Sequence, residues 1–196
     1  MRDLEIRGAG NILGKEQHGN MNLVGYDMYC LLLEQAVAEL KGQQTVEKVD
    51  TNIDIGVSAF IPSKSVEDEK QRIEMYRKIA AISTEEDIQD VEDEYIDRYG
   101  DVPESVDNLM QIAHMKHIAG GMCISEITYK DSMIVFAFER IVSTKSIVEI
   151  ISDFKGKMMF SSGNVSYLSY KCENDVIKNI KIILQKLQNA IQQDEV

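Results

Sequence analysis

The chain has 196 residues, of which 44% are hydrophobic and 28% charged, a composition that excludes disordered, collagen-like and disulfide-scaffold proteins. Its formal net charge of −12 disfavours a free-standing nucleic-acid-binding domain, because such a surface repels phosphate backbones. No apolar run approaches the roughly 20 residues of a membrane helix. The charged first residues do not predict a secretory signal. Three widely spaced cysteines predict reduced thiols in a cytoplasmic protein.

The first part of the chain predicts a loop, a helix and a linker. Residues 1–20 combine glycines with charged residues and predict a loop, whereas apolar residues at three- and four-residue steps predict a helix over residues 23–40. Residues 43–51 are polar. We therefore expect a first segment over residues 1–43 and a second domain over residues 44–196.

The second domain is predicted to start with one strand and three helices. Apolar and polar residues alternate from Ile53 to Ala59, which indicates a half-buried strand. Helices are expected over residues 67–82, from a Thr84 N-cap to Gly100, and from Pro103 at the first helical position to just before residue 120. The expected buried faces are Ile73, Tyr76, Ile79 and Ala80; Ile88, Val91, Tyr95 and Tyr99; and Val106, Leu109, Met110 and Ala113.

The rest of the chain is predicted to repeat a strand–strand–helix unit. Strands over 124–130 and 133–138 flank a short turn and precede a helix over 144–154. Strands over 157–160 and 165–170 precede a helix that begins at an Asn174 cap and ends near residue 192. Its expected buried face is Val176, Ile177, Ile180, Ile183, Leu184, Leu187 and Ile191. The predicted fold class is therefore α+β: a helical N-terminal segment, a three-helix region after a strand, then two β-hairpin–helix units.

No catalytic, cofactor or metal site is predicted from the residues themselves. The glycines before Lys15 fit neither a P-loop nor a dinucleotide-binding turn, because required glycine and hydroxyl positions hold other residues. His114 and His117 have helical spacing but no further metal ligands nearby, and His117 falls on the predicted buried face. None of the cysteines lies in a basic environment that favours a thiolate.

One segment of the chain is strongly acidic. Between Thr84 and Asn108 the only base among eleven acids is Arg98. On a helical projection Glu94, Asp97 and Arg98 lie opposite the apolar face of their helix, with Glu94 and Arg98 spaced as an ion pair. Two interpretations are open: a solvated helical face, or a docking surface for a basic partner.

Two stretches carry a family resemblance. The opening RDLEIRGAGNILGKEQHG resembles the TRG motif, which follows the second motor lobe of RecG-type helicases and of bacterial transcription-repair coupling factors. The continuation VGYDMYCLLLEQAVAELKG and the later YRKIA and IDRYG segments are similar to the coupling factors rather than to RecG. The motor, polymerase-binding and damage-recognition modules of that family precede the TRG motif, so we expect this chain to correspond to the C-terminal part.

The resemblance implies specific residue roles. Motor coupling by the TRG motif would fall on Arg7, Gly8, Gly10, Gly14 and Gln17. In the family the C-terminal domain is regulatory: it packs on the damage-recognition module and masks the surface that recruits UvrA, a subunit of the repair excinuclease. That interdomain contact would fall on Glu94, Asp97 and Arg98.

The resemblance also implies partners and cofactors. It predicts contacts with the protein's own damage-recognition module and motor lobe, indirect action on UvrA, RNA polymerase and double-stranded DNA, and no membrane partner. ATP and magnesium would belong to the motor lobes of the whole protein, with no cofactor and no catalysis in this part. Two alternatives remain open. One is residual ATPase or translocase activity of a RecG-like helicase. The other is a plain oligomerisation module whose interface is the last helix, through Ile180, Leu184, Leu187 and Ile191.

Overall fold

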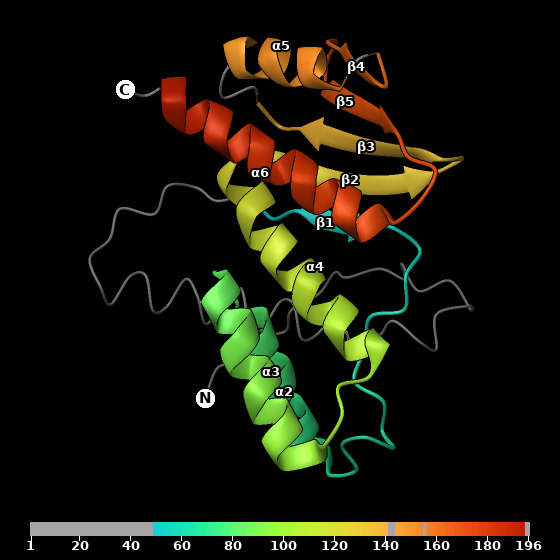
Figure 1. Ribbon diagram of the computed structural model, residues 1–196, viewed down its shortest axis with the longest axis vertical. Coiled ribbons are helices and arrows are strands. Elements are labelled where there is room, and N and C mark those ends of the chain that lie inside the picture. The colour runs from blue at the N-terminus through green and yellow to red at the C-terminus, as the bar shows by residue number, and fades with distance from the viewer. Residues whose placement is uncertain (1–48, 141–143, 155, 195–196) are drawn as a thin grey trace, which may run out of the picture. The chain divides into compact units, whose positions relative to one another are not determined.

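The computed structural model describes residues 49–140, 144–154 and 156–194, which form an α+β unit (Figure 1). The predicted loop over 1–20, the helix over 23–40 and the boundary after residue 43 lie outside the described residues. In chain order the elements are β1 (Asn52–Asp54), α2 (Glu69–Ala80), α3 (Glu85–Tyr99), α4 (Glu104–Gly121), β2 (Ile124–Lys130), β3 (Met133–Phe138), α5 (Thr144–Asp153), β4 (Met158–Ser161), β5 (Ser166–Lys171) and α6 (Val176–Asp194).

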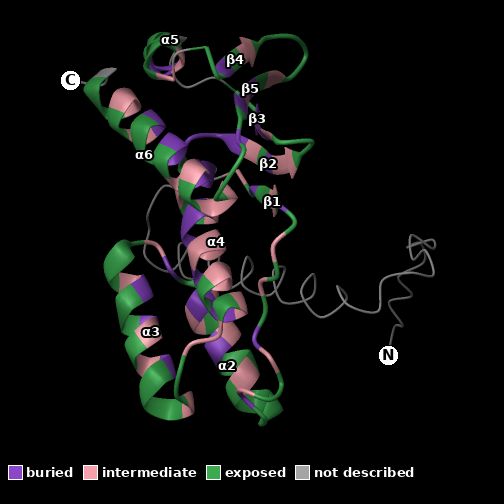
Figure 2. Cartoon of the chain, turned by 45° about the vertical axis from the view of Figure 1, so that its right-hand side comes forward, coloured by how far each residue is buried: buried purple, intermediate pink, exposed green. Residues whose placement is uncertain are grey.

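The strands form one sheet in the order β1-β2-β3-β5-β4. The short β1 runs parallel to β2, and every other neighbouring pair is antiparallel. Figure 2 shows α5, α6 and the end of α4 on one side of the sheet and no described helix on the other. Alternate residues of β3, namely Ile134, Phe136 and Phe138, are at most 4% exposed and point into this covered face.

A first hydrophobic core lies between the sheet and these helices. Its α6 contribution explains the strong periodicity of the last helix, because Ile180, Ile183, Leu184 and Leu187 are all buried in it. Three of the four residues predicted to form an oligomer interface, Ile180, Leu184 and Leu187, are thus core residues, and the fourth, Ile191, packs against the same core. The interpretation of α6 as an oligomerisation surface is wrong.

A second core lies between α2, α3 and the first half of α4. It is centred on Tyr95, which is 0% exposed and shares a 2.5 Å hydrogen bond with the Ser65 hydroxyl. Helix α4 belongs to both cores: Val106 and Met110 pack in this one, whereas Met115 and Ala119 pack against the sheet. The buried stripe of α4 therefore changes partners halfway along the helix.

Local signals in the sequence located several element boundaries. Thr84 caps α3 as expected, and its hydroxyl accepts the Asp87 N–H at 3.1 Å while the Asp87 carboxylate accepts the Thr84 N–H at 2.8 Å. Strands β2 and β3 have the predicted bounds. Their turn places Asp131 and Ser132 at φ 51° and 61°, the left-handed conformation that a two-residue hairpin requires.

Other expectations were wrong where tertiary packing decides. The strand ends at Asp54 rather than Ala59, because the chain turns away at Gly56, whose φ is +68°. In α2 the predicted core residue Ile73 is 40% exposed, and Met75 is buried in its place. A face assigned from four apolar positions in a short helix is sensitive to one such exchange.

Helix ends differ by small shifts. Pro103 is the N-cap of α4 rather than its first residue, and α4 continues through Gly120 and Gly121. At the start of α6 the capping side chain is the Asp175 carboxylate, which accepts the Lys178 N–H at 3.2 Å, rather than the predicted side-chain amide of Asn174. Strands β4 and β5 lie one residue later than expected.

Gly120 is the position where α4 approaches another backbone segment. A Cβ at Gly120 would lie 2.7 Å from the Val49 carbonyl oxygen, whereas a Cβ at Gly121 would meet nothing within 4 Å. We expect Gly120→Ala to lower the free energy of unfolding by about 1 kcal/mol or more, since the clash exceeds the gain in helix propensity. Urea denaturation at neutral pH measures this difference.

Gly121→Ala is the matched control for that substitution. It adds the same methyl group to the same helix end without a steric conflict. Its stability should be unchanged or up to about 1 kcal/mol higher. Equal stability of the two variants would contradict the close approach at Gly120.

Candidate interaction surface on helix α3

Helix α3 is held rigidly at both ends. The Asp87 carboxylate accepts hydrogen bonds from the N–H and hydroxyl of Ser83 and from the Thr84 N–H, which holds the Asp87 pKa well below its usual range. Gly100 ends the helix at φ +84°. Along its inner side Ile88, Val91 and Tyr95 are buried, so the opposite side of α3 is presented in a fixed orientation.

Glu94 and Arg98 lie at the seam between α3 and α2. The Glu94 carboxylate accepts from Lys78 Nζ at 2.6 Å and from Arg98 Nη1 at 2.7 Å, and Glu74 lies 3.8 Å from Lys78 and 3.7 Å from Arg98. The hydrogen bond from Lys78, followed by that from Arg98, lowers the pKa of Glu94. The side chains of Glu94 and Arg98 are only 30% and 29% exposed.

This network corrects the helical projection. We expected Glu94, Asp97 and Arg98 to form one outward patch, but two of the three stabilise the packing of α3 on α2. Sequence reasoning missed Lys78 and Glu74, because a contact between two helices cannot be read from spacing within one. The i, i+4 spacing of Glu74 and Lys78 was the available signal.

Asp97 belongs to a separate acidic arc on the outer side of α3. We define this arc as the exposed residues Glu86, Asp90, Asp93 and Asp97. Within the described ranges no lysine or arginine forms an ion pair with any of these four carboxylates. Ile96, 48% exposed, lies beside the arc on the same helix. The arrangement can bind a basic surface with an apolar contact at its margin.

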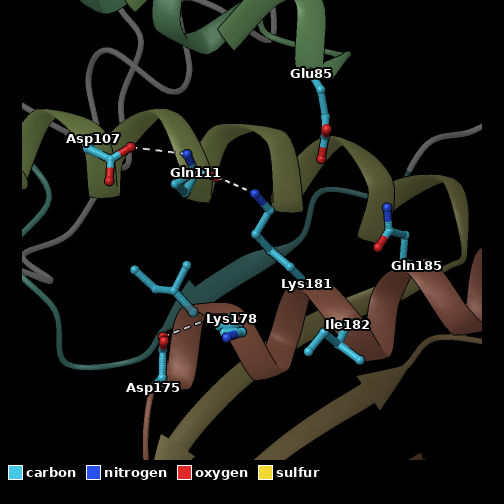
Figure 3. A pocket seen from close by; sticks show the side chains of 9 residues that line it. Glu85, Asp107, Gln111, Asp175, Lys178, Lys181, Ile182 and Gln185 are labelled. Carbon is cyan, nitrogen blue, oxygen red and sulfur yellow. Dashed lines mark hydrogen bonds between the residues drawn. The ribbon is translucent and has the colours of Figure 1, made fainter. Parts of the chain in front are cut away.

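A cleft of about 370 Å³ lies where the start of α3 faces α4 and α6 (Figure 3). Its lining residues are Glu85, Asp107, Gln111, Asp175, Ile177, Lys178, Lys181, Ile182 and Gln185. Lys181 Nζ donates to the Gln111 side chain at 2.6 Å, and Gln111 donates to Asp107 at 3.1 Å. The first bond links α6 to α4 and the second lies within α4, so several of the polar groups that line the cleft are already bonded within the fold.

His114 is buried near this cleft, one turn of α4 beyond Gln111. It is 6% exposed, and its Nδ1 has no hydrogen-bond partner among the described residues. Burial lowers the pKa of His114, and the charge of Lys181 lowers it further, whereas Glu85 and Asp87 act in the opposite direction. The sequence had placed His117 on the buried face, but the structure exposes His117 and buries His114.

The described residues contain no group of three or more side chains that could hold a metal ion. Cys123 and Cys172 are both buried as free thiols, and burial raises the pKa of Cys172. Over the described ranges every helix is too short or too polar to cross a bilayer. The TRG-like residues Arg7, Gly8, Gly10, Gly14 and Gln17 lie outside the described residues.

Comparisons with known proteins agree on one family. The family model of the TRCF domain matches residues 55–147. Transcription-repair-coupling factors of Bacillus subtilis and Borreliella burgdorferi are 44% identical over 117 residues and 30% identical over 193 residues, covering 59% and 93% of this chain. The chain spans only 10% and 17% of those two proteins.

A solved structure supports the same fold. The crystal structure of a C-terminal domain of transcription-repair coupling factor matches with a TM-score of 0.67 and 20% identity, over 75% of this chain and 97% of that one. The described residues thus form an α+β TRCF domain rather than a motor lobe. The chain belongs to the transcription-repair coupling factor family and contains its C-terminal domain.

The two sides of α3 should respond differently to loss of charge. Glu94→Gln removes the anion that Lys78 and Arg98 share, and should lower the free energy of unfolding by about 0.5–1 kcal/mol. Asp97→Asn has the same change of charge on the outer arc and should leave stability within about 0.5 kcal/mol of the parent. Urea denaturation at low salt measures both, and equal losses would contradict the division of α3 into two sides.

Buried His114 should make stability depend on pH. Burial lowers the pKa of His114 in the folded chain, so above about pH 6.5 the imidazole is neutral in both the folded and the unfolded chain and does not change the stability. Below that pH the unfolded chain binds the proton more readily, so the free energy of unfolding should fall as the pH decreases. His114→Gln should flatten the dependence of the urea midpoint between about pH 7.5 and 5. A parental slope in His114→Gln would show that other groups cause it.

Proposed function

We propose that this domain is a non-catalytic regulatory module of a transcription-repair coupling factor. In this proposal it docks on the damage-recognition module of the same protein and covers the surface that recruits UvrA. Family membership supports the setting, which is the coupling of transcription to nucleotide excision repair. The observation that carries the docking role is the acidic arc of α3: four exposed carboxylates without cationic partners among the described residues, on a helix fixed at both ends.

The three residues implied by the resemblance would then have different tasks. Asp97, in the arc, would contact the partner directly through charge. Glu94 is already paired with both Arg98 and Lys78, so Glu94 and Arg98 would act by holding α3 in position and by presenting a fixed ion pair at the α2–α3 seam. Such a patch gives register and specificity more than affinity.

The motor-coupling role would fall on the TRG-like segment. Arg7, Gly8, Gly10, Gly14 and Gln17 match the motif, and arginine and glutamine side chains can bridge polar groups that shift with the state of a nucleotide. ATP and magnesium would bind in motor lobes outside this chain, where hydrolysis drives movement along double-stranded DNA. RNA polymerase and UvrA would be reached through the whole protein.

Charge reversal in the arc tests the docking role. The double variant Asp93→Lys plus Asp97→Lys should weaken binding to an amino-terminal damage-recognition module of the family at least about tenfold, because both carboxylates lie outside the α2–α3 seam. Wild-type binding should weaken as salt is raised. Isothermal titration calorimetry measures the affinity. Reversal of Glu94 is a poorer test, because it would also disrupt the seam with Lys78.

Glu149→Lys plus Glu126→Lys is the matched control for the double variant. It makes the same change of charge at two exposed acids of the sheet region, away from α3. Its affinity should equal that of the parent chain. Unchanged binding by the arc variant, or equal weakening by both variants, would remove the acidic arc from the interface.

A further inference from the structure

We infer that the outer edge of strand β4 is a contact between two copies of this chain, whose β4 strands pair antiparallel across a twofold axis. Strand β4 ends the sheet, and within the described residues it pairs only with β5 (Figure 1). An unpaired strand edge presents a row of N–H and C=O groups to another chain. This inference is independent of the docking role of α3.

The backbone pattern identifies which groups the edge offers. The Lys171 N–H donates to the Lys157 carbonyl at 2.9 Å, in the same register that pairs Met159 with Ser169. Hydrogen-bonded pairs alternate along an antiparallel ladder, so Met159 also bonds to β5. The N–H and C=O groups of Met158 and Phe160 therefore point away from β5, toward an incoming strand.

The side chains at this edge also lack the usual protection. Exposed edge strands commonly carry charges or proline, but Met158–Ser161 has neither. Met159 is 65% exposed, the highest value among the large hydrophobic residues that the structure describes, and lies on the sheet face that no described helix covers. Tyr167, 40% exposed, lies on the same face of the neighbouring strand. The opposite edge differs, because β1 has three residues and includes Asp54.

One register satisfies both backbone and side chains. A twofold axis at Met159 places Met158 opposite Phe160 of the second copy, so that all four outward N–H and C=O groups of each strand segment are bonded. Met159 then faces Met159 of the second copy on the open face, which removes its exposed side chain from water. Lys157 would lie opposite Ser161 of the second copy, so no like charges meet.

Charge favours a second copy at this edge rather than elsewhere. Eleven acids lie between Thr84 and Asn108, and two copies meeting there would repel. Strand β4 itself is uncharged, and its turn to β5, residues 162–165, is uncharged as well. The edge is thus a part of the surface where two copies of this acidic chain can approach without opposing their acidic segments.

Sedimentation velocity of the 196-residue chain tests the contact. Between about 1 and 200 µM the chain should shift from monomer toward dimer, as mass action requires. Met159→Lys places two ammonium groups opposite each other and should raise the dimer dissociation constant at least about tenfold. Val148→Lys makes the same change at an apolar α5 residue that is 59% exposed, and should dimerise like the parent. A chain that stays monomeric over this range would overturn the inference.

A cysteine cross-link tests the register. Directly opposite residues of a non-bonded antiparallel pair have Cα atoms about 4.5 Å apart, within the range that a disulfide spans. Met159→Cys should therefore form a covalent dimer under mild oxidation. Ser161→Cys should not, because the two Ser161 residues would be four positions apart along the strands, about 13 Å. The parent chain, with its native cysteines, is the background control. A dimer that forms without the Met159→Cys cross-link, or that cross-links through Ser161→Cys, would assign the contact to another register or surface and refute the proposal.

Discussion

Helix α4 is the element on which the rest of the domain depends. Its first half buries Val106 and Met110 against α2 and α3, and its second half buries Met115 and Ala119 against the sheet. Among the described residues, the two cores share no other helix. Because a helix transmits position rigidly along its axis, the orientation of α3 relative to the sheet is set by one continuous backbone. The approach of Gly120 to the Val49 carbonyl places the far end of this helix against the segment that leads into β1.

The charge of α3 follows from the same packing. A helix with so many carboxylates gains from cations at one side, and Lys78 of α2 and Arg98 of α3 supply them where the two helices meet. The acids on the other side have no such neighbour among the described residues. Because the charge is compensated on one side of α3 only, this helix has an ion-pair network where it meets α2 and an outer acidic arc whose negative charge can attract a partner. Composition alone cannot separate these two sides.

Much of the fold could be predicted from the sequence, and the reasons for success are local. The Thr84 cap, the β2–β3 hairpin with its two-residue turn, and the buried faces of α3 and α6 depend on neighbours close in sequence. Glu94, His117 and Ile73 were misplaced because packing between elements, not spacing within one helix, decides which side is buried: Glu94 pairs with Lys78 of α2, and α4 buries His114 instead of His117. The family resemblance identified the domain correctly, but it could not show that Glu94 and Arg98 already form an ion pair within the domain.

The two proposed surfaces are energetically separable for a structural reason. The acidic arc rests on the second core, and the β4 edge rests on the first, with α4 between them. Substitutions at distant sites without shared partners act additively, so a change at Met159 leaves Asp97 and its surroundings intact. Dimerisation through β4 would leave the outer side of α3 exposed on each copy. A domain built on two cores can thus present one surface for charge recognition and another for strand pairing without either constraining the other.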